Sequence, residues 1–225
     1  MSFCLTTYNA QDGGFGMALN YEVVSDIETL VRSIENEYRH NQGLILTESD
    51  LAALVYARLR VLFLKPVNKS GLQWHMRTQD PNVLASPLHL EVPWYDVNGK
   101  LKIRPDITIL EPAQLSILHR YGDGLRLPSK QFEFAGNAII MELKFIRNKS
   151  GITVHALEQI IRDFNKVWEN LIEVRGNTNL LRSPYCLFVI FNKTDNRCTE
   201  FDHYFAEHAE GDWYKYIYGS GQVTF

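Results

Sequence analysis

Charged residues inside two apolar stretches have the clearest chemical meaning in this sequence. Lys102–Leu110 reads KIRPDITIL and contains Asp106, whereas Ala138–Ile146 reads AIIMELKFI and contains Glu142 and Lys144. Both stretches otherwise read as core β-strands, and burying a charge without a partner is costly. Clustered carboxylates beside an ammonium suit a divalent cation held against a phosphate group. We therefore treat these three residues as a candidate site.

A hairpin signal brings a further carboxylate to this site. Asn98-Gly99 favours a two-residue type I′ turn, and the strand register that follows sets Glu91 opposite Asp106. The same register pairs apolar residues on one face of the hairpin: Trp94 with Ile103, Val92 with Pro105 and Leu90 with Ile107. Two carboxylates facing each other are destabilising unless a cation, a proton or a basic side chain separates them. Glu91 is therefore a candidate beside a metal ion, with a salt bridge to Arg104 or Lys102 as the alternative.

Hydrophobic periodicity predicts the elements around the hairpin. Helices are expected from Ser25 to about His40 and from Thr47 to Phe63, with a loop over residues 64–86. A third helix follows Gly151 and runs to about Val174. Its expected buried stripe is Val154, Leu157, Ile161, Phe164, Trp168 and Leu171. Tyr185–Asn192 is apolar enough to be a strand buried on both faces, parallel to Ala138–Ile146. The result is an α/β protein.

Length and composition are those of one globular domain. The chain has 225 residues, of which 45% are hydrophobic, and no apolar run approaches the roughly 20 residues that cross a bilayer. We expect a cytoplasmic protein without membrane contact. Its three cysteines have no metal-binding spacing and are expected to be reduced thiols.

Positive charge is concentrated in the middle of the chain. The whole chain has a net charge of −3, but residues 100–182 hold 13 Lys and Arg against 9 Asp and Glu. This segment contains both charged stretches, where a polyanion would dock if the chemistry is on phosphate. Ordinary variation in surface charge explains an imbalance of this size equally well.

The order and placement of these motifs resemble the PD-(D/E)XK nuclease superfamily, through Pro105-Asp106 on one strand and Glu142-Leu143-Lys144 on the next. A Glu-x-Lys triplet alone means little, since roughly one is expected by chance in this composition. The resemblance implies a restriction-endonuclease-like mixed β-sheet core (αβββαβ) flanked by helices. That core would span about residues 47–192 of a single domain, 1–225. Residues 1–46 would form an additional N-terminal helical extension, and residues 193–225 a C-terminal extension.

The resemblance also implies roles for individual residues. Asp106 and Glu142 would bind Mg²⁺, for which Mn²⁺ substitutes, together with the backbone carbonyl of Leu143. Lys144 would position or activate the attacking water. Glu48 is the best match to a glutamate that related enzymes place on a preceding helix, with Glu35 and Glu37 as weaker candidates. Three polar residues of the third helix would contact nucleic acid or support the site: Gln159, Asp163 and Lys166.

The expected function is Mg²⁺-dependent hydrolysis of DNA phosphodiester bonds, in restriction, repair or defence against phage and mobile elements. Two alternatives stay open: a nuclease fold that binds nucleic acid or assembles without cleaving, and a nuclease that acts on RNA. Homodimer formation and a partner protein bound through the C-terminal segment also stay open. Each site residue has a structural alternative as well, such as a surface ion pair between Glu142 and Lys144, or complementation of the helix dipole by Glu48.

Overall fold

The computed structural model describes most of the chain: residues 19, 21–63, 65–67, 71–73, 76–79, 84–95, 100–117, 132–134, 137–148, 150–177, 184–194, 198–208 and 214–220. Its centre is a five-stranded mixed sheet in the order β13-β12-β11-β8-β5. The strands are β5 (Leu88–Leu90), β8 (Ile107–Leu110), β11 (Ala138–Ile146), β12 (Pro184–Asn192) and β13 (Tyr214–Ser220). β8 runs antiparallel to both of its neighbours, β5 and β11, whereas β11, β12 and β13 run parallel to one another.

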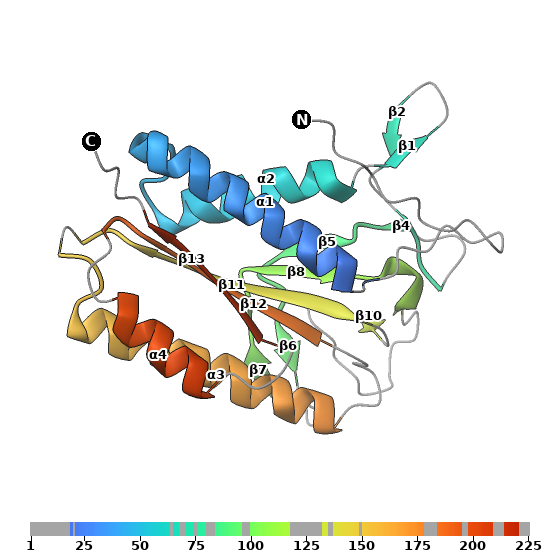
Figure 1. Ribbon diagram of the computed structural model, residues 1–225. Helices are drawn as coiled ribbons and strands as arrows, with labels where there is room; N and C mark the ends of the chain where they lie inside the picture. The colour runs from blue at the N-terminus through green and yellow to red at the C-terminus, as the bar shows by residue number, and fades with distance from the viewer. Residues whose placement is uncertain are drawn as a thin grey trace.

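Helices cover both faces of this sheet (Figure 1). On one face lie α1 (Tyr21–His40) and α2 (Glu48–Phe63), and on the other lie α3 (Val154–Asn177) and α4 (Cys198–His208). The starts of α2 and α3 lie at the same end of the sheet, where β11 ends (Figure 1). The fold is therefore mixed α/β, with an open sheet between two helical layers.

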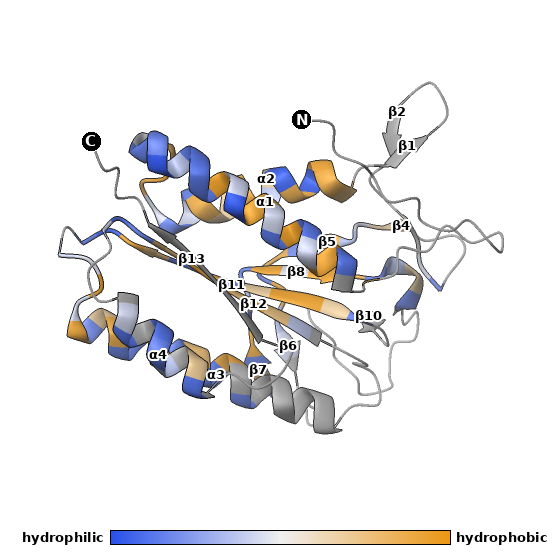
Figure 2. Cartoon of the chain, viewed as in Figure 1, coloured by the Kyte–Doolittle hydropathy of each residue, from blue (hydrophilic) through white to orange (hydrophobic). Residues whose placement is uncertain are grey.

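Alternation along β11 builds one apolar core on each face of the sheet. Ile139, Met141, Leu143 and Phe145 pack with α1 and α2, whereas Ala138 and Ile140 pack with α3. Glu142 and Lys144 continue the second row, because side chains two residues apart on a strand share a face. Figure 2 shows the apolar central strands between helices whose outer faces are polar. The predicted bounds of this strand and the predicted facing of its residues are confirmed.

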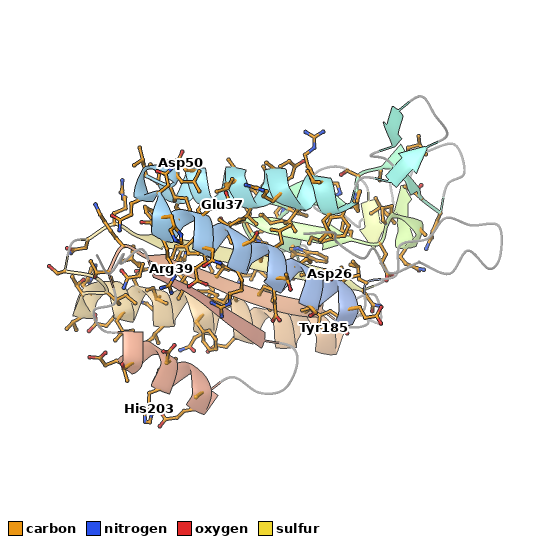
Figure 3. All side chains as sticks on the ribbon, turned by 45° about the horizontal axis from the view of Figure 1, so that its top comes forward. Asp26, Glu37, Arg39, Asp50, Tyr185 and His203 are labelled. Carbon is orange, nitrogen blue, oxygen red and sulfur yellow. The ribbon has the colours of Figure 1, made fainter. Side chains whose placement is uncertain are left out.

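Reciprocal hydrogen bonds mark the start of α2. The Asp50 amide donates to Thr47 Oγ1 at 3.1 Å, and the Thr47 amide donates to Asp50 Oδ2 at 2.9 Å. This is a capping box, which satisfies amide groups that lack helical partners. It confirms the predicted helix start and fixes Glu48 in the first turn, with Asp50 beside it (Figure 3).

The predicted hairpin has the expected register but not the expected continuity. Leu90 pairs with Ile107, and Trp94 pairs with Ile103, but next to Trp94 the register shifts by one residue, so that Tyr95 pairs with Leu101. However, residues 104–106 separate β7 (Leu101–Ile103) from β8, and β6 (Trp94–Tyr95) pairs with β7 apart from the main sheet. Pro105 has no amide hydrogen to continue a ladder, which accounts for a break at this point. The Asn98-Gly99 turn lies outside the described residues.

This break divides the expected apolar face between the two cores. Trp94 and Ile103 pack on the α3 side, whereas Ile107 packs on the α1 and α2 side. Leu90 remains about half exposed. The expectation of one continuous apolar face was therefore wrong, because it assumed regular pairing through Pro105.

Several other expectations need correction. The segment 64–86 contains short strands as well as loop: β1 (Lys65–Val67), β2 (Gly71–Gln73), β3 (Met76–Arg77) and β4 (Leu84–Ala85). Two further strands, β9 (Leu115–Ile117) and β10 (Phe132–Phe134), form an additional pair, and short 3₁₀ turns lie at Gln42–Leu44 and Pro112–Gln114. α1 begins at Tyr21 rather than Ser25. In α3, Phe164 is buried as predicted, and Leu157 and Ile161 pack partly buried against the same core, whereas Val154 is exposed. Ile160 and Val167 are buried as well, which was not predicted, and the side chains of Trp168 and Leu171 lie outside the described residues.

The C-terminal extension contributes to the sheet. β13 pairs in parallel with β12 from Cys186↔Tyr214 to Asn192↔Ser220, so the sheet extends past the predicted core boundary at residue 192. Cys186 is a buried, reduced cysteine, as expected. None of the helices in the described parts of the chain combines the length and apolarity needed to span a membrane.

Candidate active site

The candidate residues meet at the end of the sheet where β11 extends beyond β8. The β8–β11 ladder ends at the pair Met141↔Ile107, so Leu143 and Phe145 lie past it. Carboxylates take the place of the missing strand. The Leu143 amide donates to Asp106 Oδ2 at 2.7 Å, and the Phe145 amide donates to Glu48 Oε2 at 3.2 Å. Because a strand residue directs its N–H and C=O to the same side, the Leu143 carbonyl also faces this gap.

On the α3 side of the gap, Lys144 lies between two carboxylates. Its Nζ is 3.1 Å from Glu142 Oε1 and 3.2 Å from Asp163 Oδ2 on α3. Asp163 Oδ1 accepts a hydrogen bond from Gln159 Nε2 at 3.2 Å, one turn earlier on α3. The ion pair that formed the structural alternative for Glu142 and Lys144 is present, but its side chains are only 18% and 14% exposed, so it is not a surface pair, and α3 adds a second carboxylate to it.

Glu91 lies next to Asp106, as the register predicted. The Glu91 amide donates to the Asp106 carbonyl at 3.0 Å, and Glu91 adopts a φ of 50°, which non-glycine residues rarely adopt. Its side chain is exposed, and its charge raises the pKa of Asp106. Among the described residues, the alternative ion pair from Glu91 to Arg104 is not formed.

Burial and mutual repulsion disfavour the ionised carboxylates. The pKa of Glu142 is raised to about 7, mainly by burial and in addition by the charges of Asp106 and Asp163, against the lowering effect of Lys144. Burial also raises the pKa of Asp106, against the Leu143 amide and Lys144, and Glu48 and Glu91 add to the increase. The shift at Glu142 corresponds to about 3 kcal/mol against its charged form. The site therefore holds more negative charge than its single ammonium balances.

The Lys144 ammonium stays protonated. Burial alone would lower its pKa, but the charges of Glu142, Glu48 and Asp163 outweigh burial and raise the pKa above its usual value. At neutral pH this side chain is a hydrogen-bond donor and a fixed positive charge, and it cannot accept a proton. Its chemical capacity is electrostatic.

The donor set suits a hard cation with incomplete protein coordination. Asp106, Glu142 and the Leu143 carbonyl offer oxygen ligands, and Mg²⁺ is commonly held by one or two carboxylates with several waters retained. In the described ranges, no three His, Cys, Asp or Glu side chains are grouped closely enough to hold a metal ion. The described residues do not fit a closed cage of three or more side chains, and a cation here would have to be held by two carboxylates and a backbone oxygen.

The remaining candidates lie at different distances from this centre. Gln159 reaches it through Asp163, whereas Lys166 is exposed farther along α3. Glu35 pairs with Arg32 and Arg39 within α1, and Glu37 pairs with Arg58 of α2, which explains these two glutamates as structural residues. His203 on α4 points away from the sheet (Figure 3) and is exposed.

Two polar residues, one buried and one half-buried, lie beside the site without a clear signal in the sequence. Thr108 is fully buried on β8, two residues after Asp106, and its Oγ1 has no hydrogen-bond partner among the described residues. His89 pairs with Thr108 across β5 and β8, and burial lowers its pKa. A third polar residue, Glu111, accepts the Leu19 amide at 2.7 Å and so anchors the chain before α1. Only strand register relates the first two to Asp106.

We compared the chain with protein-family models, curated proteins and solved structures, and none of the three comparisons found a match.

Proposed function

We propose that this protein is a Mg²⁺-dependent nuclease that hydrolyses phosphodiester bonds in DNA. The observation that carries the proposal is the gap beside β11, where Asp106 and Glu142 lie with the Lys144 ammonium. Buried carboxylates in excess over ammonium groups favour a cation, and an ammonium beside that cation favours a substrate that carries negative charge. A phosphodiester meets both conditions.

The order of elements supports a restriction-endonuclease-like fold for this nuclease. α2 is followed by β5, β8 and β11 as an antiparallel series, then by α3 and by β12 parallel to β11. This is the αβββαβ order that the resemblance implies. In this reading, α1 and the segment containing α4 and β13 are additions to the core.

Each residue of the site has a stated role in the proposal. Asp106, Glu142 and the Leu143 carbonyl would hold Mg²⁺, or Mn²⁺ in its place. The cation supplies Lewis-acid stabilisation of the charge that develops on phosphate and lowers the pKa of water. Lys144 donates hydrogen bonds to the phosphate and the attacking water, and its positive charge stabilises the negative charge on the phosphate. Asp106 and Glu48 additionally order β11 through its amide groups.

A cleavage assay tests the proposed activity and its substrate together. The purified protein is incubated with supercoiled plasmid, linear duplex, single-stranded DNA and RNA, with Mg²⁺, with Mn²⁺ and with EDTA. We expect nicking or linearisation of DNA with either metal and none with EDTA. Cleavage of RNA alone would assign the alternative substrate. Binding to DNA without cleavage of any substrate would favour the non-cleaving module and contradict the proposal.

Glu48 offers a second test, because it either serves the site or only complements the helix dipole. Glu48→Gln keeps an oxygen for the Phe145 amide but removes a charge that acts on Asp106 and Lys144. We expect the free energy of unfolding to change by less than about 0.5 kcal/mol, as for other exposed sites. DNA cleavage should fall about ten-fold, equivalent to about 1.4 kcal/mol of lost electrostatic stabilisation.

Asp50→Asn is the matched control for Glu48→Gln, since Asp50 is an exposed acid in the same helical turn. It weakens the capping box but does not act on Asp106 or Lys144. Urea denaturation and initial cleavage rates separate the two variants. Equal losses of activity in both variants would show that Glu48 only stabilises the helix and does not serve the site.

A further inference from the structure

The Lys144 ammonium has two anchors that differ in origin. Glu142 lies on the same strand and is a candidate metal ligand, whereas Asp163 comes from α3. The two Nζ–oxygen distances, 3.1 and 3.2 Å, are nearly equal, so the ammonium is shared between the two carboxylates. Gln159 Nε2 donates a hydrogen bond to Asp163 Oδ1, which leaves Asp163 Oδ2 directed at Lys144 Nζ.

Partial burial distinguishes this arrangement from an ordinary surface ion pair. The side chains of Lys144 and Asp163 are 18% and 26% exposed. Exposed pairs contribute little because water screens them, whereas charge-assisted hydrogen bonds out of bulk water are stronger and better ordered. The contact therefore restricts where the ammonium can lie.

A divalent cation on Glu142 would change the balance between the two anchors. The cation would bind the Glu142 carboxylate, which now pairs with the Lys144 ammonium, and the cation and the ammonium would repel each other. Asp163 lies on a different element and keeps its charge for Lys144. With Asp163 in place, the ammonium can stay beside the cation instead of competing with it for Glu142.

We propose that Asp163, oriented by Gln159, is a positioning residue that holds the Lys144 ammonium in place when a divalent cation is bound at Glu142. The inference rests on the proposed function and extends it. It makes Asp163 the residue that lets one site hold an ammonium and a metal ion together. Asp163 acts through Lys144 and does not touch the reacting atoms.

The test is a double-mutant cycle measured by Mn²⁺ affinity. Asp163→Asn, Lys144→Met and the double variant are titrated calorimetrically on the full chain, after circular dichroism has shown that each is folded. In Asp163→Asn only Glu142 holds the ammonium, so we expect Mn²⁺ affinity to fall roughly ten-fold, within the usual range for contacting residues. In the Lys144→Met background the same change should have little effect.

Glu158→Gln provides the matched control, because it removes one exposed charge from the same helix. Its small effect on affinity measures the long-range contribution of charge. In cleavage assays, Asp163→Asn should lower kcat about ten-fold, with the KM for DNA nearly unchanged, because positioning acts in the transition state.

The outcomes separate this inference from the proposed function. Equal falls in affinity with and without Lys144, or no fall at all, would overturn the role of Asp163 while leaving a metal-dependent nuclease intact. A wild-type protein that neither binds Mn²⁺ nor cleaves DNA would overturn the proposed function and this inference with it.

Discussion

Asp106→Asn is expected to abolish Mg²⁺-dependent DNA cleavage while leaving the protein folded. The variant loses a metal-binding charge but keeps an oxygen that can accept the Leu143 amide. Metal ions contribute several kcal/mol to such reactions, so the expected loss is about 10³-fold or more. Initial rates on supercoiled plasmid measure it.

The same variant should be at least as stable as the wild type without metal. Burial and the charges of Glu48 and Glu91 raise the pKa of Asp106, so its ionised form is disfavoured in the folded state. Removing that charge relieves the repulsion. Asp26→Asn, an exposed aspartate of α1, is the matched control and should change neither property (Figure 3). Full activity in Asp106→Asn, or its failure to fold, would contradict the role given to Asp106.

Lys144→Met should separate catalysis from metal binding. The variant removes the donor that is proposed to stabilise charge on the phosphate, and cleavage is expected to fall about 10²- to 10³-fold, as for other electrostatic groups. Mn²⁺ affinity should hold or increase, because a positive charge next to the cation is removed. Single-turnover cleavage rates and calorimetric titration measure the two effects.

Without metal, Lys144→Met should be less stable by about 1–3 kcal/mol, since Glu142 and Asp163 lose their common partner. Mn²⁺ should restore much of this loss in thermal denaturation experiments. If the ion pair were only structural, the variant would be less stable, and its cleavage rate would fall only in proportion to the fraction of protein that is unfolded. That pattern would contradict a catalytic Lys144.

The sequence predicted the strand that organises the site because that strand is strongly patterned. Ala138–Ile146 has the predicted bounds, and its alternation correctly set Glu142 and Lys144 on one face. The register predicted from Asn98-Gly99 holds at Trp94↔Ile103 and Leu90↔Ile107, and the Glu91 amide donates to the Asp106 carbonyl, but the register shifts by one residue at Tyr95↔Leu101. Both predictions depend on local sequence: the residues of a tight turn, and the alternation of side chains along a strand.

Features that depend on tertiary packing were not predictable in the same way. The burial of Ile160 and Val167 depends on how α3 packs against the sheet. The break at Pro105, by contrast, had a local signal, because proline has no amide hydrogen for a ladder. β13 pairs with β12, but the local sequence of either strand does not indicate which strand it pairs with. Asp163 was singled out on α3, but its contact with Lys144 depends on how that helix packs on the sheet.

Calorimetric titration of Mg²⁺ and Mn²⁺ into the wild-type protein, Asp106→Asn and Glu142→Gln tests the central claim most directly. We expect saturable binding to the wild type and at least ten-fold weaker binding to each variant, since each loses a charged ligand worth about 1.4 kcal/mol or more. Absence of binding to the wild type, or equal affinity in all three proteins, would contradict a metal site between β8 and β11.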